Sequence, residues 1–584
     1  MHISETLLFT ALASLLPGIV CSQAPVTVTG LHTGIADDGE RPTRFNIEYL
    51  QALGGPQWDL YILGLREMQQ LGQNESDSFF QIAGIHGRPF TAWNGVGQAP
   101  GAQETGYCFH NEVPFITWHR PYLALYEQIL GGKIQQIARR YTGRDAALYL
   151  SAANSFRIPF WDWATDSNLP PATTWPEITV NTPEGQETIP NPLYSFVWPS
   201  VPLNHDPAWF PTTDDPVFWN STGTQRHLNP SGNLSLVVTS LRDKVYNVFA
   251  KTRDFDVMAS TANPGPSFED PHNDVHNAAG TFMYNPLYSA FDPIFWLHHA
   301  NVDRLFALWQ AINYNSTYQS KPTDIGSGTW AQPGSTQMTA DSPLAPFYRP
   351  GYGGGGPQTF HTGRTTASLK TFGYTYPEIN DWSTSPDRTR QLVIRQVNSL
   401  YGPNLVTPPP HGSGGGPPSS RHRRHSTERD NEANWPRRQR QRQRQYYVQI
   451  GVERSELSLP CEVQVLLGND TVAGSAAIMA LPPAGLTHTE IQLNREIKRF
   501  APCVEDKTVV PLLEQRLRVE IRKRDGTLIP TDSVVSLTIN VESVDVEFLD
   551  LDDELPIYGP STKYPKLGRP AAGYPLPRRR DYSI

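Results

Sequence analysis

Two histidines, His272 and His276, mark the stretch of this chain best suited to hold a metal ion. Side chains at positions i and i+4 of an α-helix lie on one face, so a helix here would carry a chelating pair. A second, apolar segment begins at Phe291 with a proline-marked turn and carries His298 and His299, either of which could add a third imidazole. Three neutral imidazoles without cysteine or carboxylate suit copper or zinc better than magnesium or calcium. One such group leaves the choice between copper and zinc open.

A second group of histidines lies upstream and consists of His86, His110 and His119, each next to aromatic or apolar residues. Residues 114–130 have helical periodicity, which places His119 in the first turns of a helix. Taken one at a time, these histidines are better explained as core or loop residues, because buried polar side chains normally find an ordinary hydrogen bond. Two such groups in one chain favour a pair of metal ions instead.

The elements that must position these histidines are mainly helices joined by long loops. Residues 56–72 carry apolar side chains at helical spacing and end on Gly72, which is typical of a helix C-cap. The chain contains 53 prolines and 45 glycines, so many loops are expected between the helices. This pattern predicts a mainly α catalytic domain over residues 24–406.

The amino-acid composition of the sequence changes after this domain. Residues 407–445 are rich in Pro, Gly, Ser, Arg and Gln and cannot bury a core, which predicts a disordered basic linker with exposed dibasic processing sites. Several stretches between residues 447 and 541 alternate apolar and polar side chains, so we expect a small antiparallel β-domain over residues 446–550. A tail over residues 551–584 follows. Within the β-domain, Cys461 and Cys503 could form a disulfide.

The composition and the N-terminus exclude other classes of protein. The net charge of −9 argues against a nucleic-acid-binding protein, because the chain lacks the excess of positive charge that would attract phosphate.

An apolar run over residues 7–20, followed by small residues, is too short for a membrane helix and predicts a signal peptide over residues 1–23. No other stretch approaches twenty apolar residues, so no membrane span is expected. We expect a secreted protein, with retention in the secretory pathway or a vacuole as the alternative. Glycosylation sequons occur at Asn74, Asn220, Asn233, Asn315 and Asn469, which predicts a glycoprotein.

The two histidine groups and the residues around them resemble those of fungal-type tyrosinases, members of the type-3 copper family. The resemblance covers roughly residues 40–380. It is carried by Cys108-x-His110, Trp118-His119-Arg-Pro-Tyr, Pro159-Phe-Trp-Asp-Trp163, His272-Asn-x-x-His276, and the run from Phe291 to Arg304 that includes His298-His299. It implies a helical-bundle core that holds two copper ions.

The resemblance also implies the role of each histidine. One copper ion would be held by His86, His110 and His119, and the other by His272, His276 and His299. The choice of His299 over His298 comes from the family, and His298 would line the substrate pocket. Cys108 would form a thioether bond with His110 and fix the orientation of its ring.

Further residues match positions that serve the reaction in the family. A phenol, with a pKa near 10, must lose its proton before its oxygen can coordinate copper. In tyrosinases of this type a glutamate and an asparagine hold a water for that purpose, and Glu269 and Asn273 match them. Phe295 would stack on an aromatic substrate, while Asn277 and Pro286 would shape the mouth of the pocket.

The function that follows from the resemblance is a tyrosinase. It would hydroxylate monophenols to o-diphenols and oxidise these to o-quinones with O2, as in melanin biosynthesis. A catechol oxidase, which lacks the first step, is the main alternative, and a haemocyanin-like oxygen carrier is a more distant one. Latent fungal tyrosinases have a comparable C-terminal domain, so we expect a zymogen that a protease activates by cutting the linker between residues 407 and 445.

Overall fold

The structure is a computed structural model of the chain. It describes residues 25–198, 216–219, 221–228, 240–351, 359–403, 441–468, 471–501, 505–549 and 552–567. The predicted signal peptide and most of the predicted linker lie outside these ranges, as do Asn220, Asn233, Asn469 and Cys503. The expected features at those positions therefore stay predictions.

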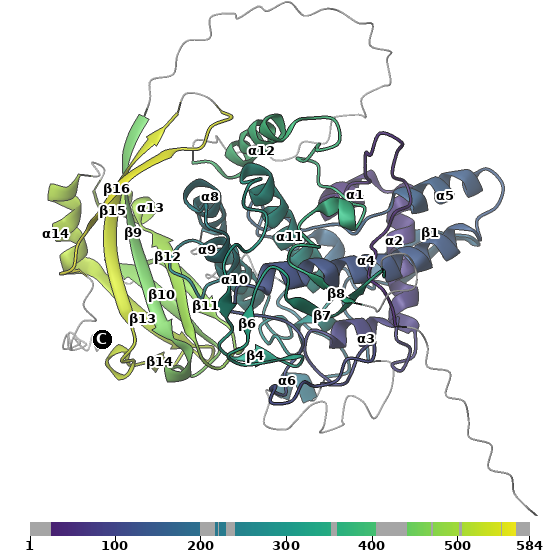
Figure 1. The fold of residues 1–584 in the computed structure, drawn as a ribbon, viewed down its shortest axis with the longest axis horizontal. Helices are drawn as coiled ribbons and strands as arrows, with labels where there is room; N and C mark the ends of the chain where they lie inside the picture. The colour runs from purple at the N-terminus through teal and green to yellow at the C-terminus, as the bar shows by residue number, and fades with distance from the viewer. Residues whose placement is uncertain are drawn as a thin grey trace, which may run out of the picture.

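Helices form most of the part of the chain that precedes the linker, as predicted (Figure 1). The α-helices are α1 (Ile47–Leu53), α2 (Gly55–Gln70), α3 (Phe79–Gly84), α4 (Phe115–Ala138), α5 (Asp145–Ser155), α6 (Pro216–Trp219), α8 (Leu241–Lys251), α9 (Phe255–Ala259), α10 (Glu269–Ala279), α11 (Ile294–Ile312) and α12 (Pro386–Tyr401). Short antiparallel strand pairs lie between them. These are β1 (Glu177–Thr182) with β2 (Gly185–Pro190), β3 (Thr323–Asp324) with β6 (Gln337–Met338), β4 (Gly328–Thr329) with β5 (Gln332–Pro333), and β7 (Pro343–Arg349) with β8 (Thr359–Thr362).

Two long helices, α4 and α11, run through the centre of this helical part. Every residue of α11 except Ala311 is buried, which is typical of a helix surrounded by other elements on all sides. Helix α4 packs against α2, α5 and α11, and α11 also contacts α10 and α12. These contacts hold the helices that carry His119, His272, His276 and His299 in one rigid core.

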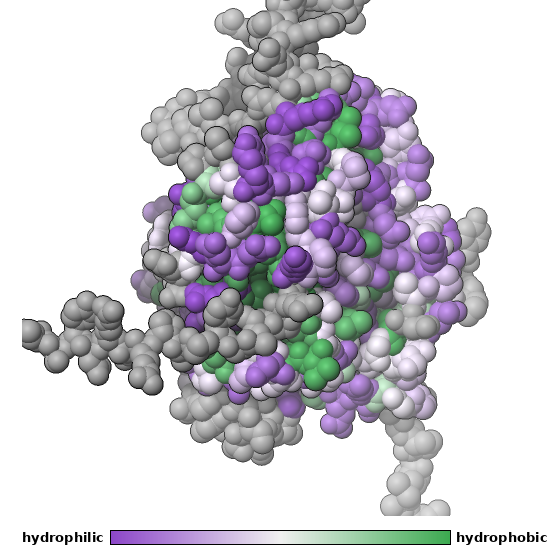
Figure 2. Space-filling model, turned by 90° about the vertical axis from the view of Figure 1, so that its left-hand side faces the viewer, coloured by the Kyte–Doolittle hydropathy of each residue, from purple (hydrophilic) through white to green (hydrophobic). Residues whose placement is uncertain are grey.

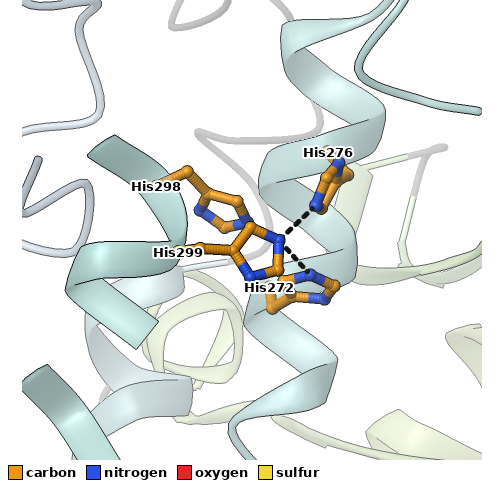
Figure 3. Close-up of side chains that lie close together, drawn as sticks. All are labelled: His272, His276, His298 and His299. Carbon is orange, nitrogen blue, oxygen red and sulfur yellow. Dashed lines mark hydrogen bonds between the residues drawn. The ribbon is translucent and has the colours of Figure 1, made fainter. Parts of the chain in front are cut away.

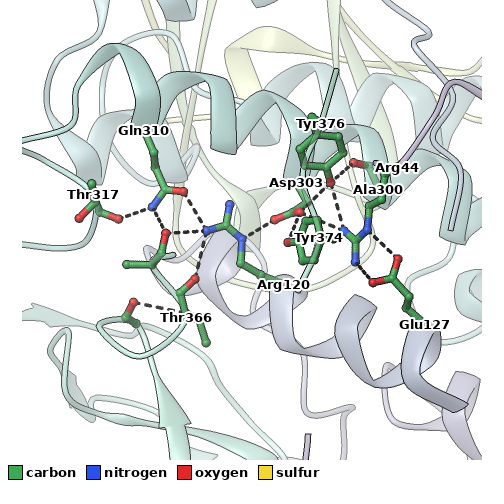
Figure 4. A network of polar contacts seen from close by, with 12 residues as sticks. Arg44, Arg120, Glu127, Ala300, Asp303, Gln310, Thr317, Thr366, Tyr374 and Tyr376 are labelled. Carbon is green, nitrogen blue, oxygen red and sulfur yellow. Dashed lines mark hydrogen bonds and ion pairs between the residues drawn. The ribbon is translucent and has the colours of Figure 1, made fainter. Parts of the chain in front are cut away.

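A buried network of charges fixes α11 against the rest of the helical part (Figure 4). The carboxylate of Asp303 accepts hydrogen bonds from Arg44 at 3.1 Å and from Arg120 at 2.6 Å. The hydroxyl groups of Tyr374 and Tyr376 donate to the same carboxylate at 2.6 and 2.7 Å. Asp303 is nearly inaccessible to solvent, so its charge is compensated entirely by these neighbours.

The part that follows the linker forms a β-domain with two four-stranded antiparallel sheets (Figure 1). One sheet has the order β11 (Thr471–Ile478), β10 (Cys461–Leu467), β13 (Leu517–Lys523), β14 (Leu528–Ile529). The other has the order β12 (Leu486–Gln492), β9 (Gln441–Glu453), β15 (Thr538–Phe548), β16 (Ile557–Lys563). Two helices, α13 (Asn494–Phe500) and α14 (Asp506–Arg516), accompany the sheets. The predicted fold class is therefore confirmed.

The β-domain extends beyond the limits expected from sequence. Strand β9 begins at Gln441, inside the predicted linker, because Arg442 and Arg444 pair with acidic side chains of the neighbouring strand β15. Strand β16 lies in the predicted tail and completes the same sheet. Cys461 is buried and has no disulfide partner among the described residues; since Cys503 is not described, their pairing stays a prediction.

The β-domain has an outer face and an inner face. The outer face is covered mostly by hydrophilic side chains, with smaller hydrophobic areas between them (Figure 2). On the inner face, β11 packs against α10 and β12 packs against α8. The helix that carries His272 and His276 thus lies directly beneath the β-domain.

Candidate metal centre

Helix α10 places His272 and His276 one turn apart, with their ring centroids separated by 4.5 Å. The Nε2 atoms of both rings lie 3.2 Å from Nε2 of His299, which projects from α11 (Figure 3). Imidazole nitrogens about 2.0–2.1 Å from one ion, arranged as a tetrahedron, lie about 3.3 Å apart. The three nitrogen atoms are therefore spaced as ligands of a single metal ion would be.

His298 lies in the same cluster as this trio. Its ring centroid is 5.0 Å from that of His272 and 4.7 Å from that of His276. The side chain is fully buried, and neither ring nitrogen has a hydrogen-bond partner among the described residues. His299 is the residue whose Nε2 lies closest to both partners, while His298 stands beside them (Figure 3).

The upstream trio forms a second cluster. His119 lies on α4, His86 follows α3, and His110 lies in the loop before α4. The ligand atoms of the three side chains all lie within 4.8 Å of one another. The Nε2 atoms of His86 and His119 have no hydrogen-bond partner in the part of the chain that the structure describes, although both are buried. Two unpaired buried nitrogens that converge are unfavourable unless a ligand binds them, so this arrangement fits a metal ion.

Backbone carbonyl groups orient three of the six predicted ligand rings. Nδ1 of His86 donates to the carbonyl oxygen of Pro286 at 2.8 Å, and Nδ1 of His119 to that of Phe115 at 2.8 Å. Nδ1 of His276 donates to the carbonyl oxygen of Met283 at 2.6 Å. These bonds fix the tautomer and leave each Nε2 free to bind a metal. Sequence could not identify these acceptors, because any residue type offers a carbonyl oxygen.

The two clusters are adjacent. The rings of His119 and His299 stack with their centroids 4.5 Å apart, and those of His110 and His272 lie 6.1 Å apart. The residues of both predicted trios therefore meet at one place in the fold. Two metal ions at such a place could hold one small molecule between them.

Burial also sets the charge of these histidines. It lowers the pKa of His119 to about 3 and that of His276 to about 4. For His86, His110, His272 and His299 burial lowers the pKa well below its usual range. The imidazoles are thus neutral near pH 7, which is the state that binds a metal.

Cys108 lies between two histidines of the first cluster. Its Sγ donates to the carbonyl oxygen of His86 at 2.9 Å and lies 3.4 Å from Nδ1 of His110. Burial raises the pKa of this thiol well above its usual range. The sulfur is therefore close enough to the His110 ring for the predicted bond, but it is not a thiolate in this environment.

Glu269 and Asn273 both lie on α10 near the second cluster. The Oδ1 atom of Asn273 accepts a hydrogen bond from Nδ1 of His272 at 3.0 Å, so this side chain orients a predicted metal ligand. The carboxylate of Glu269 is buried and accepts hydrogen bonds from Ser260, Thr261 and the backbone of Asn111. Burial raises the pKa of Glu269, and these hydrogen bonds oppose that rise.

The other predicted pocket residues differ in exposure. Phe295 is fully buried, and its ring stacks on His299 with a centroid distance of 4.1 Å. Asn277 is the only residue of α10 that is not buried. Pro286 is buried, and its carbonyl group binds His86. The roles of these residues toward a substrate stay predictions.

A loop of the β-domain covers the first cluster. Leu481, Pro482 and Pro483 line the same narrow pocket as Cys108 and His110. Buried Arg454 holds this loop in place, because its guanidinium group donates to the carbonyl oxygens of Pro482 and Met479 at 2.7 and 2.6 Å. The β-domain thus reaches the immediate surroundings of the metal centre.

Comparisons with known proteins agree with this geometry. The family model described as the common central domain of tyrosinase matches residues 76–312. A tyrosinase of Podospora anserina is 34% identical over 412 residues, a match that covers 65% of this chain and 70% of that protein. This chain belongs to the tyrosinase family. A tyrosinase of Neurospora crassa is 37% identical over 409 residues, but that match spans only 58% of its length.

Solved structures of the family share the fold over nearly the whole chain. A mushroom tyrosinase, from a crystal that contains both the latent and the active form, superposes with a TM-score of 0.74 at 23% identity, covering 92% of this chain and 98% of that one. An Aspergillus oryzae pro-tyrosinase mutant gives a TM-score of 0.67 at 21% identity, covering 93% and 98%. The predicted family is therefore confirmed. Tyrosinases contain a type-3 dicopper centre, and the two buried histidine clusters fit two copper ions by their donor atoms and by their neutral charge.

Proposed function

We propose that this chain is a copper-dependent tyrosinase that converts monophenols to o-diphenols and o-diphenols to o-quinones, using O2. The observation that carries the proposal is the meeting of two buried histidine trios whose Nε2 atoms converge. When bound, the two copper ions supply the redox chemistry that activates O2. The chain itself holds the ions, orients the phenol and accepts its proton.

Neutral imidazoles and a dry environment support this chemistry. The carbonyl groups of Pro286, Phe115 and Met283 hold three of the rings so that Nε2 faces the metal site. The ring of Phe295 lies against His299 and His86, where it excludes water and offers an apolar surface near the substrate. This arrangement favours an aromatic substrate over a charged aliphatic one.

Proton removal from the phenol is assigned to Glu269 together with Asn273, which would hold a water between them. Both residues lie on α10 with two of the copper ligands, and Glu269 is buried near the cluster. A positioned base near the reacting hydroxyl group commonly contributes about 10²–10⁴-fold to the rate. The presence of both residues supports monophenol hydroxylation and weighs against a catechol oxidase.

We also propose that the enzyme is secreted as a latent glycoprotein. The loop that carries Leu481 to Pro483 stands over Cys108 and His110, which supports shielding of the centre by the β-domain. The sequons at Asn74 and Asn315 lie at exposed positions, as glycosylation requires. None of the helices in the described ranges is both long and apolar enough to span a bilayer. A protease would activate the enzyme by cutting the linker.

Copper content and initial rates test the proposal together. The purified chain should bind about two copper ions and, after limited proteolysis in the linker and removal of the β-domain, form quinone from tyramine without added diphenol. Oxidation of diphenols alone would instead identify a catechol oxidase. Copper binding without any quinone formation after proteolysis would point to an oxygen carrier. Equal rates for the intact chain and for the helical part separated from the β-domain would contradict latency but not the activity.

A further inference from the structure

The carboxylate of Glu269 is held by residues that lie outside its own helix. Oε2 accepts hydrogen bonds from the Ser260 hydroxyl at 3.0 Å, from the Thr261 backbone at 2.8 Å and from the Thr261 hydroxyl at 3.1 Å. Oε1 accepts a short hydrogen bond from the backbone N–H of Asn111. We call Ser260, Thr261 and Asn111 the carboxylate cradle.

The two oxygen atoms of Glu269 are therefore not equivalent. A carboxylate has about four acceptor positions, two on each oxygen. The Ser260 hydroxyl and the Thr261 backbone N–H can fill both positions on Oε2, with the Thr261 hydroxyl at 3.1 Å beside them, whereas the described residues offer only one donor to Oε1. Oε1 is thus the atom with room for a further hydrogen bond from a water molecule. The cradle therefore determines which oxygen can accept a further hydrogen bond.

Thr261 is the member of the cradle with the most connections. Its hydroxyl group has a single proton, and this proton lies within reach of both Oε2 of Glu269 and Oδ1 of Asn111, the latter at 2.9 Å. Asn111 follows the predicted copper ligand His110 and has a left-handed backbone with φ of 55°. A rotation of Thr261 or a shift of Asn111 would therefore move the carboxylate relative to the first histidine cluster.

The β-domain holds the same cradle from the other side. The side-chain amide of Asn111 donates to the carbonyl oxygen of Leu486 at 2.9 Å, and the backbone N–H of His488 donates to that of Thr261 at 2.7 Å. Both partners belong to strand β12. The cradle is thus built from the helical part and closed by the β-domain.

We propose that Thr261 is a positioning residue for monophenol hydroxylation, which orients Glu269 so that Oε1 serves the phenol proton. The proposal rests on the role that the proposed function gives to Glu269. A purely structural alternative exists, because an acidic side chain in the first turn of a helix stabilises that helix. The two explanations differ in one respect. A structural defect would lower both activities, whereas a misplaced base would lower monophenol hydroxylation alone.

Four variants of the full-length chain separate these explanations. Thr261→Val removes the hydroxyl group at nearly constant volume, and Thr261→Ser restores it. Thr252→Val is the matched control, because Thr252 is similarly buried and its hydroxyl donates to the carbonyl oxygen of Pro266, away from Glu269. Glu269→Gln removes the base itself. Each variant is loaded with copper, cleaved in the linker and separated from the β-domain in parallel with the parent, and then assayed with tyramine and with 4-methylcatechol.

Thr261→Val should lower kcat for tyramine by about tenfold or more, since misplacing a catalytic group by about 1 Å can cost about a hundredfold. Its copper content should match the parent, and kcat for 4-methylcatechol should stay within about twofold. Thr261→Ser should recover most of the tyramine rate, and Thr252→Val should not change the ratio of the two rates.

Three results would overturn the inference. Equal losses on both substrates, or no loss on tyramine while Glu269→Gln is impaired, would show that Thr261 does not position the base. A normal tyramine rate in Glu269→Gln would remove the role of Glu269 itself, and the inference with it. Lack of all oxidation by the copper-loaded parent would instead contradict the proposed function.

Discussion

At the scale of single residues, the metal centre depends on the group that binds the Nδ1 atom of a histidine ring. In His86, His119 and His276, Nδ1 is bound by a backbone carbonyl group, so that Nε2 is left for the metal. Hydrogen bonds of this kind orient metal ligands and raise their basicity.

The two neighbouring histidines of α11 allow a test of the ligand assignment. His299→Ala should lower the copper content from about two ions to about one per chain, because it removes the nitrogen that lies 3.2 Å from both His272 and His276. His298→Ala should keep both ions. Copper is measured by atomic absorption after gel filtration. The reverse pattern would assign His298 as the ligand.

A second residue-scale prediction concerns the sulfur of Cys108. Formation of the thioether would join Sγ to a ring carbon of His110 with loss of two hydrogen atoms, which O2 would accept in the copper-loaded protein. The peptide that contains both residues should therefore be lighter by two hydrogen atoms in the copper-loaded, oxygen-exposed protein than in protein prepared without copper. Mass spectrometry of Cys108→Ser, which cannot form the bond, gives the control. An unchanged peptide mass after oxygen exposure would exclude the link.

The sequence shows the candidate histidines but not the groups that hold them. Spacing identifies His272 and His276, and their neighbours identify the family, because residue types are visible in a sequence. The carbonyl oxygens of Pro286 and Met283 are not visible in this way, since they are part of the backbone. The sequence does not predict Ser260 and Thr261 as partners of Glu269 for another reason. A short polar side chain in a loop belongs to no recognisable pattern, and only the fold brings these two close to Glu269.

At the scale of elements, α11 is fixed by two separate sets of charges. The adjacent residues Asp303 and Arg304 do not pair with each other. Asp303 binds Arg44 and Arg120, whereas Arg304 binds Asp162 and Glu378. Successive residues of an α-helix point about 100° apart, so neighbours in sequence reach different partners. The helix that carries His299 is thereby tied to the helical core on two sides.

Removing the charge of Asp303 should destabilise the helical part strongly. In Asp303→Asn, buried Arg120 loses the carboxylate with which it pairs, while Arg44 keeps its ion pair with Glu127, and breaking a buried ion pair in this way costs about 3–5 kcal/mol. Guanidinium unfolding followed by tryptophan fluorescence measures the loss. The matched control is Asp341→Asn, whose partner Arg364 is exposed, and which should not change the unfolding midpoint. Equal midpoints for both variants would show that the network in Figure 4 does not stabilise the fold.

The strands that meet the metal-site helix were harder to predict than the helices. Strand β11 is rich in Ala, Gly and Ser, so it lacks the large alternating apolar side chains that indicate a strand. The structure gives the reason for this composition at Gly474, where an added Cβ would lie 2.5 Å from the Ile491 side chain. Close packing between β11 and β12 thus requires small residues. As a result, β11 lacks the alternating pattern from which a strand is predicted.

At the scale of the whole molecule, the linker is only one of the connections between the two parts. Buried Lys244 binds Asp270 and Asp274 of α10 and also the carbonyl oxygen of Ser475 in β11. Asp274 accepts a hydrogen bond from the backbone of Ala477, and Lys251 forms an ion pair with Glu490. None of these contacts involves the linker.

Cleavage of the linker alone should therefore leave the β-domain bound. After limited proteolysis, both fragments should elute together on gel filtration at neutral pH and moderate salt. Activity should appear only as the β-domain dissociates, because its loop stays over Cys108 and His110 until then. Full activity in a complex that still contains both fragments would contradict this order of events.

Weakening the interface should speed that dissociation. In Glu490→Gln, Lys251 loses its partner at 2.5 Å, and truncating one member of a buried interfacial charge pair mainly raises the dissociation rate. We expect activity to appear at least about tenfold faster after cleavage, since such a loss costs about 2 kcal/mol or more. Glu505→Gln is the control, because the ion-pair partner of Glu505 among the described residues is the exposed Lys507, inside the β-domain. Time courses of quinone formation and of fragment separation should change together in Glu490→Gln and stay as in the parent in Glu505→Gln. Faster activity without faster separation would mean that the loop opens while the β-domain remains docked.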